Sequence, residues 1–213
     1  MGLDITVVMA DWEHLARIPA AARLDALIDA VCPDYCCDPC EEADRAVPGG
    51  WVWQRRTPWC AEYRFFGTTG TYAWHFRLAE AWEDLRPSTA PALRESLDRF
   101  LGGLVWHGPD RWAGAGADPD DGPRPAPGFP ADPAPWRPEV LALGSPDEVA
   151  ALARAWETAA PRLEELREPF AAAAGRRPAW FATFDVAGAL LREWGDVVTG
   201  AGERGWGLIG LPY

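Results

Sequence analysis

Five cysteines are the most concentrated reactive groups in the sequence. Four of them fall between positions 32 and 40, and Cys60 follows in the next predicted hairpin. Cys37 and Cys40 have the C-x-x-C spacing of half a structural zinc site, and such a site needs a second pair of ligands. The sequence therefore predicts a candidate zinc site formed by Cys32, Cys37, Cys40 and Cys60, with Cys36 as an alternate ligand.

Two other interpretations of these cysteines stay open. Reduced thiols without a function are common in cytosolic loops. The Cys37–Cys40 spacing also matches redox motifs, although the strand leading into a helix that such motifs need is not evident here. His14 and His75 are reserve zinc ligands.

His75 is the histidine best placed for catalysis. It lies in the predicted helix 72–85, just after the hairpin that carries Cys60, so a Cys60–His75 nucleophile and base pair is possible. No third group that would orient the histidine can be identified, and the sequence contains neither HExxH nor G-x-S-x-G. The simpler expectation is that His75 is half-buried beside a carboxylate.

A short glycine-threonine segment, 67–71, precedes the same helix. Its backbone N–H groups could bind an anion, or it could be an ordinary turn with a threonine cap. A phosphate loop would need a lysine, and all 20 basic residues of the chain are arginine. The absence of lysine also excludes Schiff-base chemistry. The composition is typical of a GC-rich, actinobacterial genome.

The net charge of −12 restricts the possible partners. So acidic a chain repels nucleic acids and anionic membrane surfaces, and it favours a basic protein partner. No apolar run is long enough to cross a membrane, and the N-terminus lacks the features of a signal peptide. We therefore expect a cytoplasmic protein.

Alternating and helical patterns define the elements of the N-terminal half. Asp11 is a predicted helix N-cap. A Trp-rich hairpin is predicted to turn around Thr57-Pro58, with alternate residues of its second strand buried. The expected strands are 3–9, 51–53 and 60–66, and the expected helices follow Asp11, begin after Pro19, span 72–85 and run from Ser88 or Thr89 to Gly102-Gly103.

Residues 108–138 contain nine of the 21 prolines and almost no aliphatic side chains. A stretch of this composition cannot bury enough apolar surface to fold alone. We interpret it as a loop insertion in a single domain that spans 1–213. Trp106, Trp112 and Trp136 flank it or lie in it; they would either attach it to the body or form an exposed aromatic patch.

The C-terminal half has strong helix signals. Ser145-Pro146-Asp147-Glu148 is a capping box, and the apolar stripe behind it should break before Pro161. A last helix should end at Gly200 and Gly202, and residues 206–211 predict a terminal strand. The expected fold is α+β: a mixed sheet with N- and C-terminal strands and a hairpin, packed against several helices. Of the tryptophans, four lie on helical stripes and should be core: Trp74, Trp82, Trp156 and Trp194.

Residues 95–210 resemble the YfbM-like family of small uncharacterised bacterial proteins. The similarity lies in "LDRFLGG", "SPDEVAALARAW", "LEELREPF" and "VAGALLREWGDVVTGAGERGWGLIGL", which occur in the family's order. This resemblance implies an α+β fold and carries no activity or catalytic residues. The N-terminal cysteines and the Trp-rich hairpin are departures from it.

Taken together, these features predict an acidic cytosolic binding or interaction protein without an evident catalytic site. The alternatives are a small enzyme with a site near the Trp-rich hairpin and His75, and a protein with a structural zinc at the Cys32–Cys40 loop.

Overall fold

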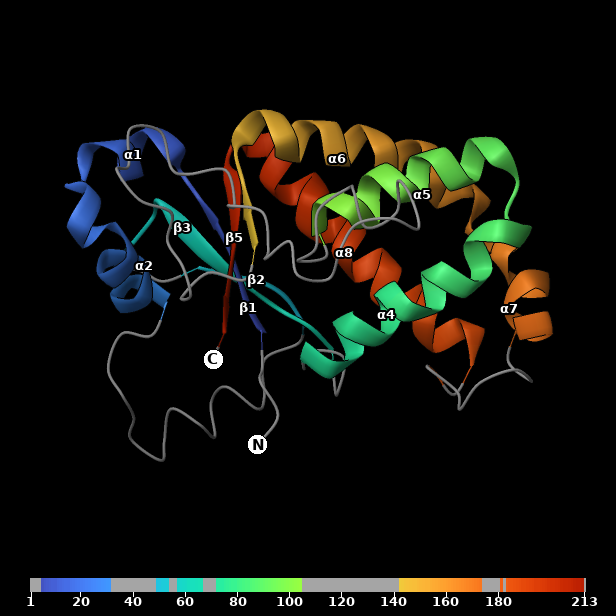
Figure 1. Ribbon diagram of the computed structural model, residues 1–213. Coiled ribbons are helices and arrows are strands. Elements are labelled where there is room, and N and C mark those ends of the chain that lie inside the picture. Colours follow the sequence, from blue (N-terminus) through green and yellow to red (C-terminus); the bar gives the residue numbers. More distant parts are fainter. Residues whose placement is uncertain are drawn as a thin grey trace, which may run out of the picture.

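The fold is built on one five-stranded sheet. The computed structural model describes residues 5–31, 49–53, 57–66, 72–104, 142–173, 181 and 183–212. The strand order is β2-β3-β1-β5-β4, and every pairing is antiparallel (Figure 1). The strands are β1 (Ile5–Ala10), β2 (Gly50–Trp53), β3 (Cys60–Arg64), β4 (Ala142–Gly144) and β5 (Gly207–Pro212).

The predicted α+β class is confirmed, as are the N-terminal strand, the C-terminal strand and the hairpin. The expectation of a mixed sheet is wrong, because β1 runs antiparallel to both β3 and β5. Alternation of apolar residues locates a strand without giving its direction. The direction of each strand depends on the end of the sheet at which the preceding helices return the chain.

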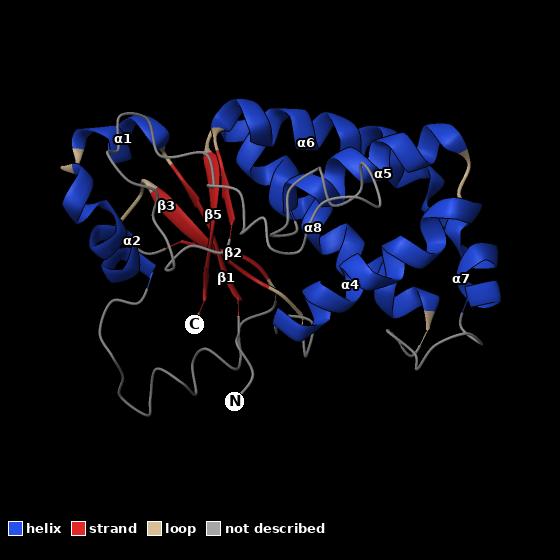
Figure 2. Ribbon diagram, viewed as in Figure 1, coloured by secondary structure: helices blue, strands red, loops and turns tan. Residues whose placement is uncertain are grey.

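Helices cover both faces of the sheet (Figure 2). One face carries α1 (Trp12–Arg17) and α2 (Arg23–Val31), which are linked by a short 3-10 turn. The larger helical layer packs on the other face and extends away from it. It comprises α4 (Tyr72–Leu85), α5 (Pro91–Leu104), α6 (Pro146–Ala159), α7 (Arg167–Ala173) and α8 (Phe184–Arg204).

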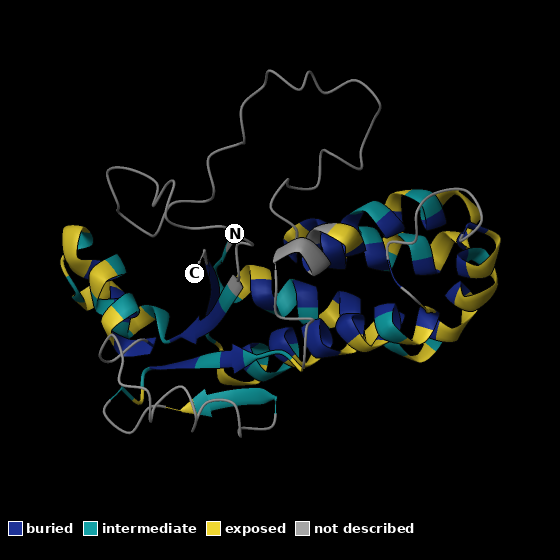
Figure 3. Cartoon of the chain, turned by 90° about the horizontal axis from the view of Figure 1, so that it is seen from below, coloured by how far each residue is buried: buried dark blue, intermediate teal, exposed yellow. Residues whose placement is uncertain are grey.

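Successive residues of β1 point into two separate cores. Val7 and Met9 belong to the core under the larger helical layer, whereas Val8 and Ala10 belong to the core under α1 and α2. All four are at most 2% exposed. Because β1 is buried on both faces, it lies between two helical layers, and the buried sides of the helices turn inward in Figure 3.

Most of the predicted helix starts and stops are confirmed. The Asp11 side chain caps α1 by accepting from the backbone N–H groups of Glu13 and His14. Ser145 and Glu148 form the capping box of α6. Before Pro161 the α-helix gives way to a 3-10 segment, Ala160–Leu166, because proline removes a backbone donor at that point.

The predicted end of α8 is wrong. The helix runs through Gly200 and Gly202 to Arg204 and is capped by Gly205, which adopts the left-handed conformation with φ of 65°. A Cβ on Gly200 would lie 2.5 Å from Nε1 of Trp51, so this glycine lets the hairpin approach α8 closely. This close contact explains why residue 200 is glycine, since the helix does not end there.

Candidate functional site

The candidate zinc ligand that the structure describes, Cys60, is fully buried. Its side chain lies in the core under α1 and α2. Burial raises the pKa of the thiol to about 11, although the side chain of Thr57 opposes the shift. The Sγ–H donates to the carbonyl oxygen of Thr57. Val31, the last residue of α2, is in the same core, so the chain enters its cysteine-rich segment beside the Cys60 core.

The remaining candidate ligands, Cys32, Cys36, Cys37 and Cys40, lie outside the described residues. Among the residues that are described, no cluster of three or more His, Cys, Asp or Glu could hold a metal ion. The zinc site therefore stays a prediction. Zinc would stabilise the Cys60 thiolate, which is the opposite of what burial does.

We expect Cys60 to be unreactive toward a disulfide reagent in the native protein at pH 8. Below its raised pKa of about 11 the group is the neutral thiol, and only about one part in a thousand is thiolate at pH 8. Counting fast-reacting thiols in the wild type and in Cys60→Ala checks this, and the two counts should agree. A fast thiol that disappears in Cys60→Ala would contradict the buried position.

The metal itself is checked by elemental analysis of the purified protein. Stoichiometric zinc that is lost in Cys60→Ala would support the four-cysteine site. A protein without zinc, with all five thiols titrating after unfolding, would reject it.

His75 is 1% exposed and lies on the opposite face of the sheet from Cys60. Its Nδ1 accepts a hydrogen bond of 2.8 Å from the Nε1–H of Trp194, and the Phe65 ring packs on it with a centroid distance of 4.8 Å. His75 is thus fully buried rather than half-buried, and it accepts a hydrogen bond from an indole. The Cys60–His75 pair is also wrong, because the sheet separates the two side chains.

Two carboxylates of α8, Glu193 and Asp196, act on residues of β3 or just beyond its end. The buried Glu193 accepts a 2.7 Å hydrogen bond at Oε1 from the backbone N–H of Phe66, which fixes the end of β3 to the helix. Partial burial raises the pKa of Asp196. The pKa of Tyr63 is raised by its own burial and further by the charges of Asp196 and Glu193. The phenol therefore keeps its proton, and the bond from Phe66 to Glu193 links the end of β3 to α8.

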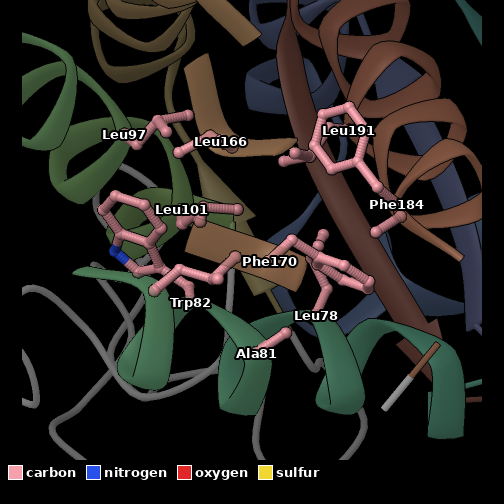
Figure 4. Close-up of a pocket in the computed structure, with 11 residues that line it drawn as sticks. Leu78, Ala81, Trp82, Leu97, Leu101, Leu166, Phe170, Phe184 and Leu191 are labelled. Atoms are coloured by element: carbon pink, nitrogen blue, oxygen red, sulfur yellow. The ribbon is translucent and has the colours of Figure 1, made fainter. Parts of the chain in front are cut away.

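Two cavities that the described residues form in the larger core are small and apolar. One, between α4, α5, α7 and α8, has a volume of about 20 Å³ (Figure 4). Another of about 20 Å³ lies between the sheet and α6. A volume of this size holds about one water molecule. Neither cavity could take a substrate. The first is lined by Leu78, Ala81, Trp82, Leu85, Leu97, Leu101, Leu166, Phe170, Phe184, Ala187 and Leu191.

Four tryptophans gather at one end of the sheet and form the site that best fits a binding function. We call them the tryptophan rim: Trp12, Trp53, Trp59 and Trp206. The strand register places them together, because Ala10 pairs with both Cys60 and Gly207. Trp12, Trp59 and Trp206 lie within two residues of these three paired positions. Trp53 ends β2 opposite Ala61 at the same end.

The rim is partly open to solvent, and its members lie on both faces of the sheet: Trp12 and Trp59 pack against the core under α1 and α2, whereas Trp206 packs against the larger core. Trp53 is 39% exposed, and its ring centroid lies 5.8 Å from that of Trp206. Trp59 stacks on His14 at 4.7 Å with an interplanar angle of 12°. Trp12 packs on Gly207, where a Cβ would come within 2.2 Å of its ring.

A cation already lies on this aromatic surface. The guanidinium carbon of Arg204 is 4.3 Å from the ring centroid of Trp53 and 5.5 Å from that of Trp206. Aromatic faces of this kind bind basic side chains by cation–π attraction.

The sequence interpretation missed the rim, although a signal was present. Each of its tryptophans lies within three residues of a predicted strand end. Recognising the cluster needs the pairing of β1, β3 and β5, which the sequence pattern does not give. The core tryptophans were predicted correctly: Trp82, Trp156 and Trp194 are at most 8% exposed.

Other predicted features lie outside the described residues. These are the 67–71 segment, the side chain of Trp74, and the 108–138 insertion with Trp106, Trp112 and Trp136. No family model matches the chain, and neither the curated proteins nor the solved structures contain a similar one. The resemblance to the YfbM-like family therefore stays a prediction. Within the described part of the chain, every helix is too short or too polar to span a membrane.

Proposed function

We propose that this chain is a cytoplasmic binding protein for a basic protein partner, and that the tryptophan rim is its contact surface. The observation that carries the proposal is the gathering of four tryptophans, one of them 39% exposed, at one end of the sheet. Tryptophan is enriched in the residues that dominate binding energy at protein interfaces.

The charge of the chain supports a basic partner. A net charge of −12 raises the rate of encounter with a positively charged protein and disfavours acidic competitors. Arginine and lysine side chains can also use the indole faces of the rim directly, by cation–π attraction. Charge thus accounts for the approach of the partner, and the rim accounts for where it binds.

Capture of partners on the immobilised chain, followed by titration of the purified partner, tests the proposal. The matched variants are Trp53→Ser with Trp206→Ser at the rim, and Phe66→Ser as the control. Phe66 is also an exposed aromatic residue, at 57%, but it follows β3 at the opposite end from the rim. We expect a basic partner whose affinity falls with increasing salt and drops at least tenfold in the rim variant alone.

Two results would reject the proposal. The first is a partner without excess positive charge whose affinity is independent of salt. The second is equal binding by the rim variant and the Phe66→Ser control, which would move the contact surface elsewhere on the molecule.

A further inference from the structure

The Arg204 side chain occupies the most exposed part of the tryptophan rim. It is the last residue of α8, immediately before the left-handed Gly205, and it is exposed. Its guanidinium lies over the Trp53 ring and beside the Trp206 ring, which are themselves in contact. The two indoles thus form a surface whose size and chemistry suit a planar cation.

Guanidinium suits this surface better than ammonium does. It is planar and weakly hydrated, so it can lie flat on an aromatic ring while keeping its N–H groups toward water or a carboxylate. Tryptophan is the strongest of the aromatic residues for this contact.

Arg204 is held less firmly than other arginines of the protein. Arg86 makes two hydrogen bonds, of 2.7 and 2.9 Å, to the carboxylate of Asp98. Arg167 bonds to both Glu164 and Asp185. Within the described residues, the contacts of Arg204 are the two indole rings. A cation–π contact at an exposed site is weak, so another cation can replace it.

We infer that the indoles of Trp53 and Trp206 form an arginine-binding site. Arg204 occupies this site in the free protein, and an arginine of the partner displaces it. The inference rests on the proposed function, and it deepens that function by naming the recognised side chain. It assigns Trp53 and Trp206 as the recognition surface and makes Arg204 a competitor for it. Removal of Arg204 should therefore strengthen the binding of an external arginine.

The test uses the full chain and two probes, an acetylated tri-arginine amide and the matching tri-lysine amide. Binding is followed by NMR through the indole N–H resonances of Trp53 and Trp206, which Trp53→Phe and Trp206→Phe assign. The key variant is Arg204→Ala. Its control is Arg192→Ala, which removes an exposed positive charge from the same helix, where Arg192 lies 3.6 Å from Glu164.

We expect tri-arginine to shift both indole resonances of the wild type, with tri-lysine binding more weakly. Arg204→Ala should bind tri-arginine about two- to fivefold more tightly than Arg192→Ala does, which is the gain from removing one weak cation–π competitor. Because both variants lose one positive charge, the difference between them is not an effect of net charge.

Equal affinities of Arg204→Ala and Arg192→Ala would overturn the inference, as would a titration that leaves the two indole resonances unmoved. Either result leaves the proposed function standing if the captured partner is basic and still needs the rim. Loss of the partner's salt-dependent binding would instead reject the proposed function, whatever the peptides do.

Discussion

Replacing Gly195 with alanine is expected to destabilise the protein by about 1–3 kcal/mol, although alanine is the better helix former. Gly195 is buried in α8 where that helix crosses α6, and an added Cβ would lie 2.0 Å from Cε2 of Trp156. Trp156 cannot move aside easily, because it is 8% exposed and stacks on Phe100 at 4.9 Å. Urea unfolding monitored by circular dichroism measures the change.

Gly188→Ala is the matched control in the same helix. A Cβ at Gly188 would meet the flexible end of Arg192, with 3.4 Å to Nη1 as the closest approach. That side chain can shift, so the helix propensity of alanine should dominate and stabilise the protein by up to about 1 kcal/mol. If both substitutions changed the stability in the same direction, the close crossing of α6 and α8 would be wrong.

His75→Leu is expected to lower the free energy of unfolding by about 2–4 kcal/mol. The substitution removes the acceptor of the Trp194 Nε1–H, and a buried donor left without a partner is costly. The two aromatic neighbours of the imidazole, Phe65 and Trp194, would also lose their packing against it. Thermal and urea unfolding of the variant provide the measurement.

A double-mutant cycle isolates the hydrogen bond. Trp194→Phe alone leaves Nδ1 of His75 without its donor, whereas the double variant removes both polar groups. The loss in the double variant should therefore be smaller than the sum of the single losses by about 1–2 kcal/mol. Strict additivity would show that the bond contributes nothing. A double variant that keeps the partner's affinity would also place His75 in the core rather than in a functional site.

Local signals were sufficient to predict most of the helices and strands. The helix over 72–85 was predicted with the limits that the structure shows, since its apolar positions repeat with the helical period. The capping box at Ser145 and the break before Pro161 follow from backbone hydrogen bonding over a few residues. Such signals need no knowledge of the tertiary fold.

The errors concern features that depend on distant contacts. Gly200 and Gly202 have the composition of a helix end, but Gly200 is glycine because Trp51, about 150 residues earlier, packs against it. The separation of Cys60 and His75 depends on which face of β3 each side chain meets. The tryptophan rim depends on strand register in the same way. Residue types suggest the chemistry, and the pairing of strands decides which residues meet.

The centre of the sheet has a consequence for how the protein is made. β1 and β5 are far apart in the sequence, since Ile5 pairs with Pro212. During synthesis β1 leaves the ribosome long before β5 and cannot complete its pairing until β5 has followed. The larger helical layer has no finished sheet to cover until then. A nascent chain that stops before residue 207 has an unpaired edge on β1, so quality control in the cell would encounter it as an aggregation-prone intermediate.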